Sequence, residues 1–181
     1  MGCGKSSVGR KLSQLLCCPF MDLDSVIEDR TGRSIPEIFA NDGEAAFRQM
    51  ELDTLQNILR EVGRQSVLSL GGGTVMTPEC AELVRENTTC IYLRASVDTL
   101  ASRLVSEAEG RPLLNPASHP ESTDSNNSLN VSAADLRSRI ESLMSRRAST
   151  YEDTAHITID TDSLSVDEIA QTLAEKISPI R

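Results

Sequence analysis

The sequence is poor in aromatic residues, with no tryptophan, two tyrosines and three phenylalanines among 181 residues. Hydrophobic residues nevertheless make up 39% of the chain, so a core has to be built from aliphatic side chains. The length is typical of one domain, and we expect a single domain over residues 1–181.

Long apolar runs are also lacking. The longest, from Leu15 to Met21, falls far short of the ~18–20 residues that a membrane-spanning helix needs. The first residues do not show the charged and then apolar pattern of a secretory signal peptide. We therefore expect a cytosolic protein that has no membrane partner.

Basic residues are outnumbered by acidic ones. The chain has 18 Lys and Arg against 27 Asp and Glu, which gives a net charge of −9. Proteins that bind nucleic acid or anionic lipid need a basic face, so this balance argues against both partners.

No cysteine pair has the Cys-x-x-Cys spacing of a zinc site. The chain has five cysteines, and the adjacent Cys17 and Cys18 cannot close an ordinary disulfide. We expect reduced thiols and no zinc.

Apolar periodicity alternates between helices and short strands along the chain. Helices are expected at 5–16, 35–40 and 43–62, and after Thr77, Ser96, Asn130 and Ser165; strands are expected at 19–21, 66–70, 90–93 and 156–159. Two Ser-x-x-Glu capping boxes, beginning at Ser34 and Ser165, mark helix starts. Strands separated by helices predict an α/β fold with a parallel sheet.

The segment from Gly2 to Ser7 opens the first helix and matches the second half of the phosphate-loop motif G-x-x-x-x-G-K-[ST]. In such a loop Lys5 would reach the β- and γ-phosphates of ATP, and Ser6 would bind Mg²⁺. The same residues fit the N-myristoylation pattern Met-Gly-x-x-x-Ser. Because the segment runs directly into an apolar-faced helix, we favour the phosphate loop.

Two pairs of charged residues follow. Asp22 and Asp24 lie at the end of a strand, where ligand sites of α/β proteins are commonly found. One carboxylate could bind Mg²⁺ and the other a substrate hydroxyl. A solvated helix start is the alternative. Arg48 and Glu51 share one helix face, so Glu51 can orient Arg48 toward an anion, although a surface ion pair has the same spacing.

Glycines and arginines complete the pattern. Gly71, Gly72 and Gly73 follow a strand and suit a ligand that lies against the backbone, the alternative being a simple turn. Arg111 precedes a polar loop at 117–130 and could belong to a mobile lid. Arg147 lies near the C-terminus of a helix, where its charge could instead interact with the helix dipole. Together these elements indicate phosphoryl transfer from ATP to a hydroxyl.

The ordered motifs MGCGKSSVG, FMDLD, GRSIPEIF, GE..FR..E, LGGG, RPLL and R-x-x-x-Y-E-D-T-A resemble the shikimate kinase family. This resemblance implies phosphorylation of the 3-hydroxyl of shikimate with ATP and Mg²⁺, in aromatic amino-acid biosynthesis. The alternatives are a related small-molecule kinase, such as a gluconate kinase, and an inactive fragment that lacks its N-terminal part.

The resemblance also assigns roles to individual residues. The catalytic residues would be Lys5, Asp24 as base and Arg111. ATP would bind at Gly2, Cys3, Gly4, Lys5, Ser6, Ser7, Arg111 on its phosphates and Arg103 against its adenine. Mg²⁺ would be held by Ser6 and, through water, by Asp22. Shikimate would bind at Asp24, Arg48, Gly71, Gly72, Gly73 and Arg147.

The implied fold is the three-layer P-loop kinase fold of the nucleoside monophosphate kinases, with a five-stranded parallel sheet of order 2-3-1-4-5. Residues 35–62 would form the substrate-binding subdomain and 107–132 a lid with an extended polar insert, in a monomer. The central first strand of the family has no counterpart after residue 1, so we expect unpaired neighbours and an opened core. We hypothesise that the functional protein starts upstream of residue 1.

Overall fold

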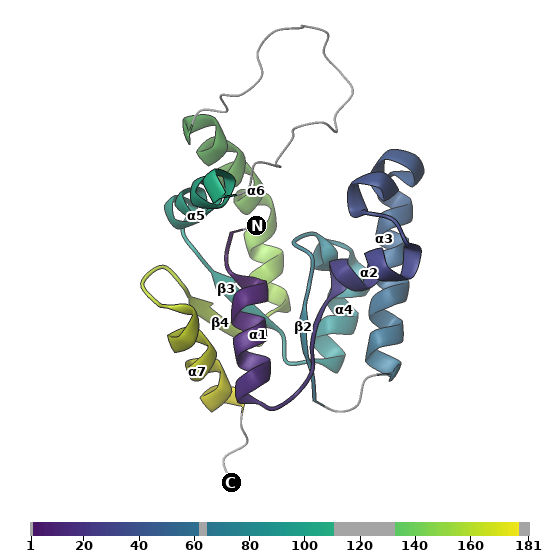
Figure 1. Cartoon of the computed structure of the whole chain (residues 1–181), viewed down its shortest axis with the longest axis horizontal. Helices are drawn as coiled ribbons and strands as arrows, with labels where there is room; N and C mark the ends of the chain where they lie inside the picture. The colour runs from purple at the N-terminus through teal and green to yellow at the C-terminus, as the bar shows by residue number, and fades with distance from the viewer. Residues whose placement is uncertain (1, 62–64, 111–132, 178–181) are drawn as a thin grey trace, which may run out of the picture.

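The computed structural model of the chain describes residues 2–61, 65–110 and 133–177, which form an α/β structure (Figure 1). The strands are β1 (Phe20–Asp22), β2 (Val67–Ser69), β3 (Ile91–Arg94) and β4 (Ile157–Asp160). The helices are α1 (Lys5–Leu15), α2 (Leu23–Thr31), α3 (Ile35–Glu61), α4 (Pro78–Asn87), α5 (Val97–Gly110), α6 (Ala133–Thr154) and α7 (Val166–Ile177), with a 3₁₀ turn, η1, at Thr74–Met76.

The strands of the described residues pair in parallel, but in two separate sheets. β1 pairs with β2, with Phe20 opposite Val67, and β3 pairs with β4, with Ile91 opposite Ile157. These pairs correspond to strands 2–3 and 4–5 of the order 2-3-1-4-5. The expected fold class is confirmed.

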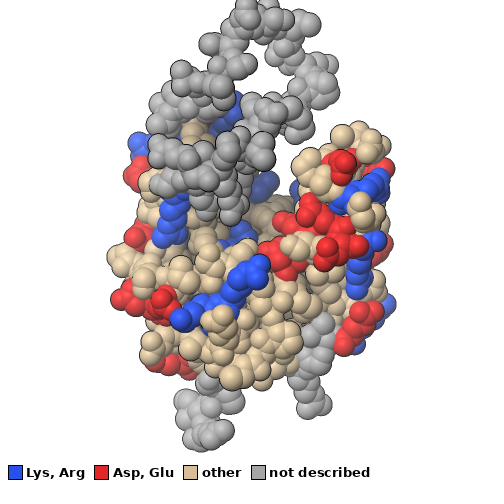
Figure 2. Space-filling model, in the orientation of Figure 1, with Lys and Arg blue, Asp and Glu red and all other residues tan. Residues whose placement is uncertain are grey.

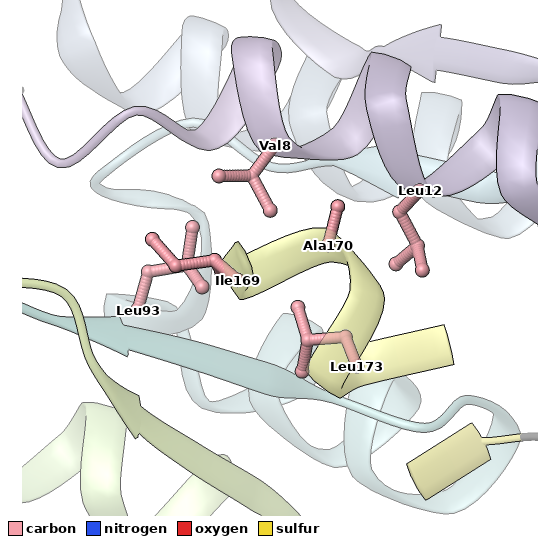
Figure 3. Close-up of a cluster of buried hydrophobic side chains, with 6 residues drawn as sticks. All are labelled: Val8, Leu12, Leu93, Ile169, Ala170 and Leu173. Carbon is pink, nitrogen blue, oxygen red and sulfur yellow. The ribbon is translucent and has the colours of Figure 1, made fainter. Parts of the chain in front are cut away.

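An aliphatic core joins α1 and α7 to the second sheet. Val8 and Leu12 are one turn apart on α1 and are each 3% exposed. Figure 3 shows them facing α7 and Leu93 of β3. The complete cluster is Val8, Leu12, Leu93, Ile169, Ala170 and Leu173. The core is therefore aliphatic, as the composition requires.

A second core holds α2 and α3 together. Leu23 and Ile27, also one turn apart, are fully buried against Ile38, Phe47 and Ile58 of α3. From the sequence, α2 was anticipated only as the alternative of a helix start at Asp22 and Asp24, because its apolar stripe is so short. The Asp22 side chain caps this helix by accepting a hydrogen bond from the N–H of Asp24 at 3.2 Å.

α3 joins the two helices expected at 35–40 and 43–62. The join is at Gly43, whose φ of 81° and ψ of 174° are not helical and favour glycine. The capping box that starts α3 is confirmed, since the Ser34 N–H donates to Glu37 Oε2 at 2.8 Å. At α7, Ser165 N–H donates to Glu168 Oε2 in the same way, also at 2.8 Å.

Two negative expectations from composition can also be compared with the structure. All five cysteines are free thiols. None of the helices in the described part of the chain has the length and hydropathy of a bilayer-spanning segment.

Candidate active site

The expected phosphate loop forms a tight turn that leads into α1. Gly2 and Gly4 have left-handed φ angles of 70° and 82°, and Gly4 is the N-cap of the helix. The first N–H groups of a helix have no partner within it, so they can bind an anion. The ammonium of Lys5 lies over the loop and donates to Cys3 Sγ at 3.7 Å. Lys5 and the N-terminus of α1 thus both provide positive charge at the loop.

Oxygen ligands suitable for Mg²⁺ lie beside this loop. Ser6 Oγ donates to Asp22 Oδ2 at 3.0 Å, although Ser6 and Asp22 come from α1 and β1. Mg²⁺ prefers oxygen ligands, takes only one or two of them from the protein and completes its shell with water and phosphate oxygens. The oxygen atoms of Ser6 and Asp22 are therefore suitable ligands for Mg²⁺.

Asp24, in the first turn of α2, has a perturbed carboxyl group. Its pKa is raised above the ordinary value, first because the side chain is partly buried, and then because Asp22 and Glu51 repel its negative charge. Lys5 opposes this shift. A carboxylate whose pKa is raised accepts a proton more readily, as a general base must.

The glycine turn lies directly against this carboxylate. A Cβ atom at Gly71 would be 2.9 Å from Asp24 Oδ1 and 3.1 Å from Glu51 Oε1. A side chain at Gly71 would therefore displace these carboxylates. The backbone of the turn lies against Asp24.

Arg48 is held rigidly from α3. Its Nη1 donates to Glu51 Oε2 at 2.5 Å and its Nη2 to Glu44 Oε1 at 3.0 Å. The Glu51 side chain is only 1% exposed, and its other oxygen accepts from Thr74 Oγ1 at 2.6 Å. A surface ion pair is thus wrong for Arg48 and Glu51, because one partner is buried and fully hydrogen-bonded.

Arg147 reaches the same glycine turn from α6. Its Nη1 donates to the carbonyl oxygen of Gly72 at 3.2 Å, and the Tyr151 hydroxyl donates to that oxygen as well. The ring of Tyr151 packs on Tyr92 of β3, with 5.3 Å between centroids. Since the Arg48 guanidinium lies against Gly73, two arginines approach neighbouring residues of one turn.

Sequence reasoning missed two supports of this site. Thr74 fixes the second oxygen of Glu51, and Tyr151 anchors the carbonyl of Gly72. Arg147 and Tyr151 are four residues apart, so they share one face of α6, and this spacing could have indicated the pair.

Of the other residues expected to contact ATP, the structure describes Arg103 but not Arg111. Arg103 on α5 donates to the Thr161 carbonyl oxygen at 3.0 Å, so its guanidinium is held beside the segment after β4. Its helix adjoins the phosphate loop, since a Cβ at Gly2 would be 3.2 Å from Leu104. Arg111 and residues 111–132 of the expected lid lie outside the described residues.

Charge is unevenly distributed over the surface. Figure 2 shows Lys and Arg side chains over α1 and, next to them, Asp and Glu side chains over α2. In a chain with a net charge of −9, anions can bind only where placed cations outweigh the surrounding acidic residues. Lys5 lies at the phosphate loop, and Arg48 and Arg147 lie at the glycine turn.

Comparisons with known proteins agree with this geometry. The family model described as shikimate kinase matches residues 1–178. A shikimate kinase of Chlorobium chlorochromatii is 40% identical over 176 residues, which cover 97% of this chain and 86% of that protein.

Solved structures of the same description are also similar. The shikimate kinase of Acinetobacter baumannii in complex with shikimate has a TM-score of 0.78 at 29% identity, with coverage of 98% of this chain and 88% of that one. The shikimate kinase of Bacteroides thetaiotaomicron has a TM-score of 0.80 at 26% identity, with coverage of 99% and 94%.

Proposed function

The chain belongs to the shikimate kinase family, and from this membership and the site we infer that it transfers the γ-phosphoryl group of ATP to the 3-hydroxyl of shikimate. The product is shikimate 3-phosphate, with ADP released. No observation favours a gluconate kinase or a protein without activity.

The observation that carries the assignment of the acceptor site is the pair of arginines on one glycine turn. Arg48 is oriented by buried Glu51, and Arg147 is tied to the carbonyl of Gly72. A planar guanidinium binds a carboxylate through two parallel hydrogen bonds. We propose that both arginines bind the carboxylate of shikimate while the backbone of Gly71–Gly73 lies against its ring.

Asp24 is proposed as the general base. Its carboxylate lies beside Gly71, so a hydroxyl of a substrate held on the glycine turn comes within its reach. The carboxylate accepts the proton of the 3-hydroxyl as that oxygen bonds to the γ-phosphorus and the bond to the β-phosphate oxygen breaks. Its raised pKa favours this transfer.

ATP is proposed to bind on the other side of Asp24. The backbone of Gly2, Cys3 and Gly4 and the side chain of Lys5 would contact its phosphates, Ser7 would follow in the first helical turn, and Arg103 would lie against adenine. Ser6 and Asp22 would hold Mg²⁺, which neutralises charge on the β- and γ-phosphates when bound.

Two features of organisation follow from the same proposal. Residues 35–62 would act as the substrate-binding subdomain, because α3 in this range supplies Arg48 and the buried Glu51 that orients it. A monomer would suffice, since every proposed residue comes from one chain.

An ADP-release assay with shikimate and with gluconate tests the function. We expect turnover with shikimate and none above background with gluconate, and the reverse preference would reject the assignment. Arg48→Ala should raise the KM for shikimate far more than the KM for ATP. Arg30→Ala is the matched control, because Arg30 pairs with Glu61 at 3.6 Å on the surface, away from the glycine turn.

A further inference from the structure

Thr161, the first residue after β4, is a polar residue that the structure buries completely, with 0% of its surface exposed. Its N–H and its hydroxyl both donate to the carbonyl oxygen of Arg94, at 2.8 and 3.1 Å. Arg94 and Asp160 form the last pair of the ladder between β3 and β4. Thr161 therefore fastens the segment after β4 to the end of β3, and its buried hydroxyl has the hydrogen-bond partner that burial requires.

The oxygen atoms of Thr161 also hold the guanidinium of Arg103 from α5. Nη2 of Arg103 donates to the carbonyl oxygen of Thr161 at 3.0 Å, and Nη1 donates to the hydroxyl oxygen Oγ1 at 3.5 Å. A threonine hydroxyl can accept one hydrogen bond while it donates another, so the contacts to Arg103 and to Arg94 are compatible. Because a guanidinium is planar, two contacts to one residue fix the orientation of its plane.

The next residue, Asp162, ties the same segment to the start of α5. Asp162 Oδ1 accepts from the N–H of Ser96 at 2.9 Å, and Ser96 Oγ caps the helix by accepting from the N–H of Thr99 at 3.2 Å. The pKa of the Asp162 carboxyl is lowered, first by the backbone hydrogen bond from Ser96, with a smaller contribution from the positive charge of Arg103. The segment after β4 thus holds α5 at its first turn and again at Arg103.

The position of α5 places this arginine near the phosphate loop (Figure 1). A Cβ atom at Gly2 would lie 3.4 Å from the carbonyl oxygen of Leu100 and 3.2 Å from the side chain of Leu104, which directly follows Arg103. An unrestrained arginine has many rotamers, and holding it in one of them costs conformational entropy when a ligand binds. Because the contacts to Thr161 already restrain Arg103, that cost is smaller.

We propose that Thr161 is a positioning residue for ATP, whose hydroxyl and carbonyl oxygens hold the guanidinium of Arg103 in the plane that stacks on adenine. This inference rests on the proposed function for the role of Arg103, and it adds the residue that orients this arginine. Thr161 acts through Arg103 and not on the reacting atoms. Its effect therefore belongs to the binding of the nucleotide and not to the transfer step.

Removal of the Thr161 hydroxyl from the 181-residue chain tests the proposal. Thr161→Val keeps the shape of the side chain, whereas Thr161→Ser keeps the hydroxyl. The KM for ATP comes from steady-state kinetics, and the Kd for ADP comes from titration calorimetry, which needs no turnover. We expect Thr161→Val to raise both constants about 2- to 10-fold through loss of one hydrogen bond to Arg103, with kcat and the KM for shikimate almost unchanged. Thr161→Ser should retain the wild-type constants.

Thr154→Val is the matched control for lost stability. Thr154 is 5% exposed, and its hydroxyl donates to the carbonyl oxygen of Thr150 in its own helix at 2.7 Å. We expect both valine variants to lower the unfolding midpoint, and Thr161→Val alone to weaken nucleotide binding. Equal weakening by the two variants, or by Thr161→Val and Thr161→Ser, would overturn the proposal.

A double-mutant cycle with Arg103→Ala separates this inference from the proposed function. Arg103→Ala alone should raise the Kd for ADP, and Thr161→Val should then have almost no further effect. If Arg103→Ala leaves the Kd unchanged, the proposed place of Arg103 against adenine is wrong, and the positioning role is wrong with it. If Arg103→Ala raises the Kd while Thr161→Val does not, or if the two effects add fully, only the positioning role of Thr161 is wrong.

Discussion

Replacing Gly73 with alanine should displace Arg48 without harming the fold. A Cβ atom at Gly73 would lie 2.7 Å from both terminal nitrogens of the Arg48 guanidinium, closer than non-bonded atoms approach. The backbone itself tolerates alanine, because Gly73 has a φ of −104°. The side chain of Arg48 therefore has to leave its contacts with Glu51 and Glu44.

The size of the effect follows from what Arg48 is proposed to bind. A hydrogen-bonded contact to a charged group contributes about 1.5–3 kcal/mol. Its loss corresponds to an increase of about 10- to 150-fold in the KM for shikimate, at about 1.4 kcal/mol per factor of ten. The KM for ATP should change little. The unfolding midpoint should stay within a few degrees, because alanine also restricts the unfolded chain.

Steady-state kinetics of a double-mutant cycle check this reasoning. Gly73→Ala, Arg48→Ala and the double variant are compared for the KM of both substrates, with thermal unfolding as the control for stability. In the Arg48→Ala background, Gly73→Ala should have almost no further effect. Fully additive effects would refute the claim that the glycine acts through Arg48.

Four further predictions concern Asp24 and Tyr151. Asp24→Asn should lower kcat by about 10²- to 10⁴-fold, and unchanged turnover would remove Asp24 as base. At pH 7 the same variant should unfold at no lower temperature than the wild type, as measured by calorimetry. Because the pKa of Asp24 is raised, the folded state favours the protonated form, and ionised Asp24 lowers stability as the pH rises through that pKa. A lower unfolding temperature of the variant would contradict this sign. In the wild type, kcat/KM should fall on the acid side with an apparent pKa above that of an ordinary aspartate, and a pH profile that follows an ordinary value would argue against Asp24. Tyr151→Phe keeps the packing on Tyr92 but removes one hydrogen bond to Gly72, so it should raise the KM for shikimate about 2- to 10-fold. An equal rise in the KM for ATP would contradict a positioning role.

The fold could be predicted largely because its signals are local. The capping boxes at Ser34 and Ser165 and the apolar spacing of Val8 and Leu12 each depend on residues within one helical turn. α2 was anticipated only as an alternative, a helix start at Asp22 and Asp24, because only Leu23 and Ile27 mark its buried face. The kink at Gly43 was likewise anticipated only as a break between two helices.

The site was predictable to the extent that its motifs are contiguous. Lys5, Ser6 and the three glycines stand in short motifs, and Arg48 and Glu51 share a helix face. What the sequence alone could not supply was the contact between Thr74 and Glu51, which are 23 positions apart, or between Tyr151 and Gly72, which are 79 apart. Contacts of this kind depend on how the strands and helices pack.

The central claim, that Asp24, the two arginines and the phosphate loop form a shikimate kinase site, is tested most directly by identifying the product. The protein is incubated with ATP, Mg²⁺ and shikimate, and phosphorus NMR and mass spectrometry follow the reaction. We predict shikimate phosphorylated at its 3-hydroxyl in equal amount to ADP, and no such product with Asp24→Asn. ADP formed at the same rate without shikimate, or phosphate attached at another position, would contradict the account.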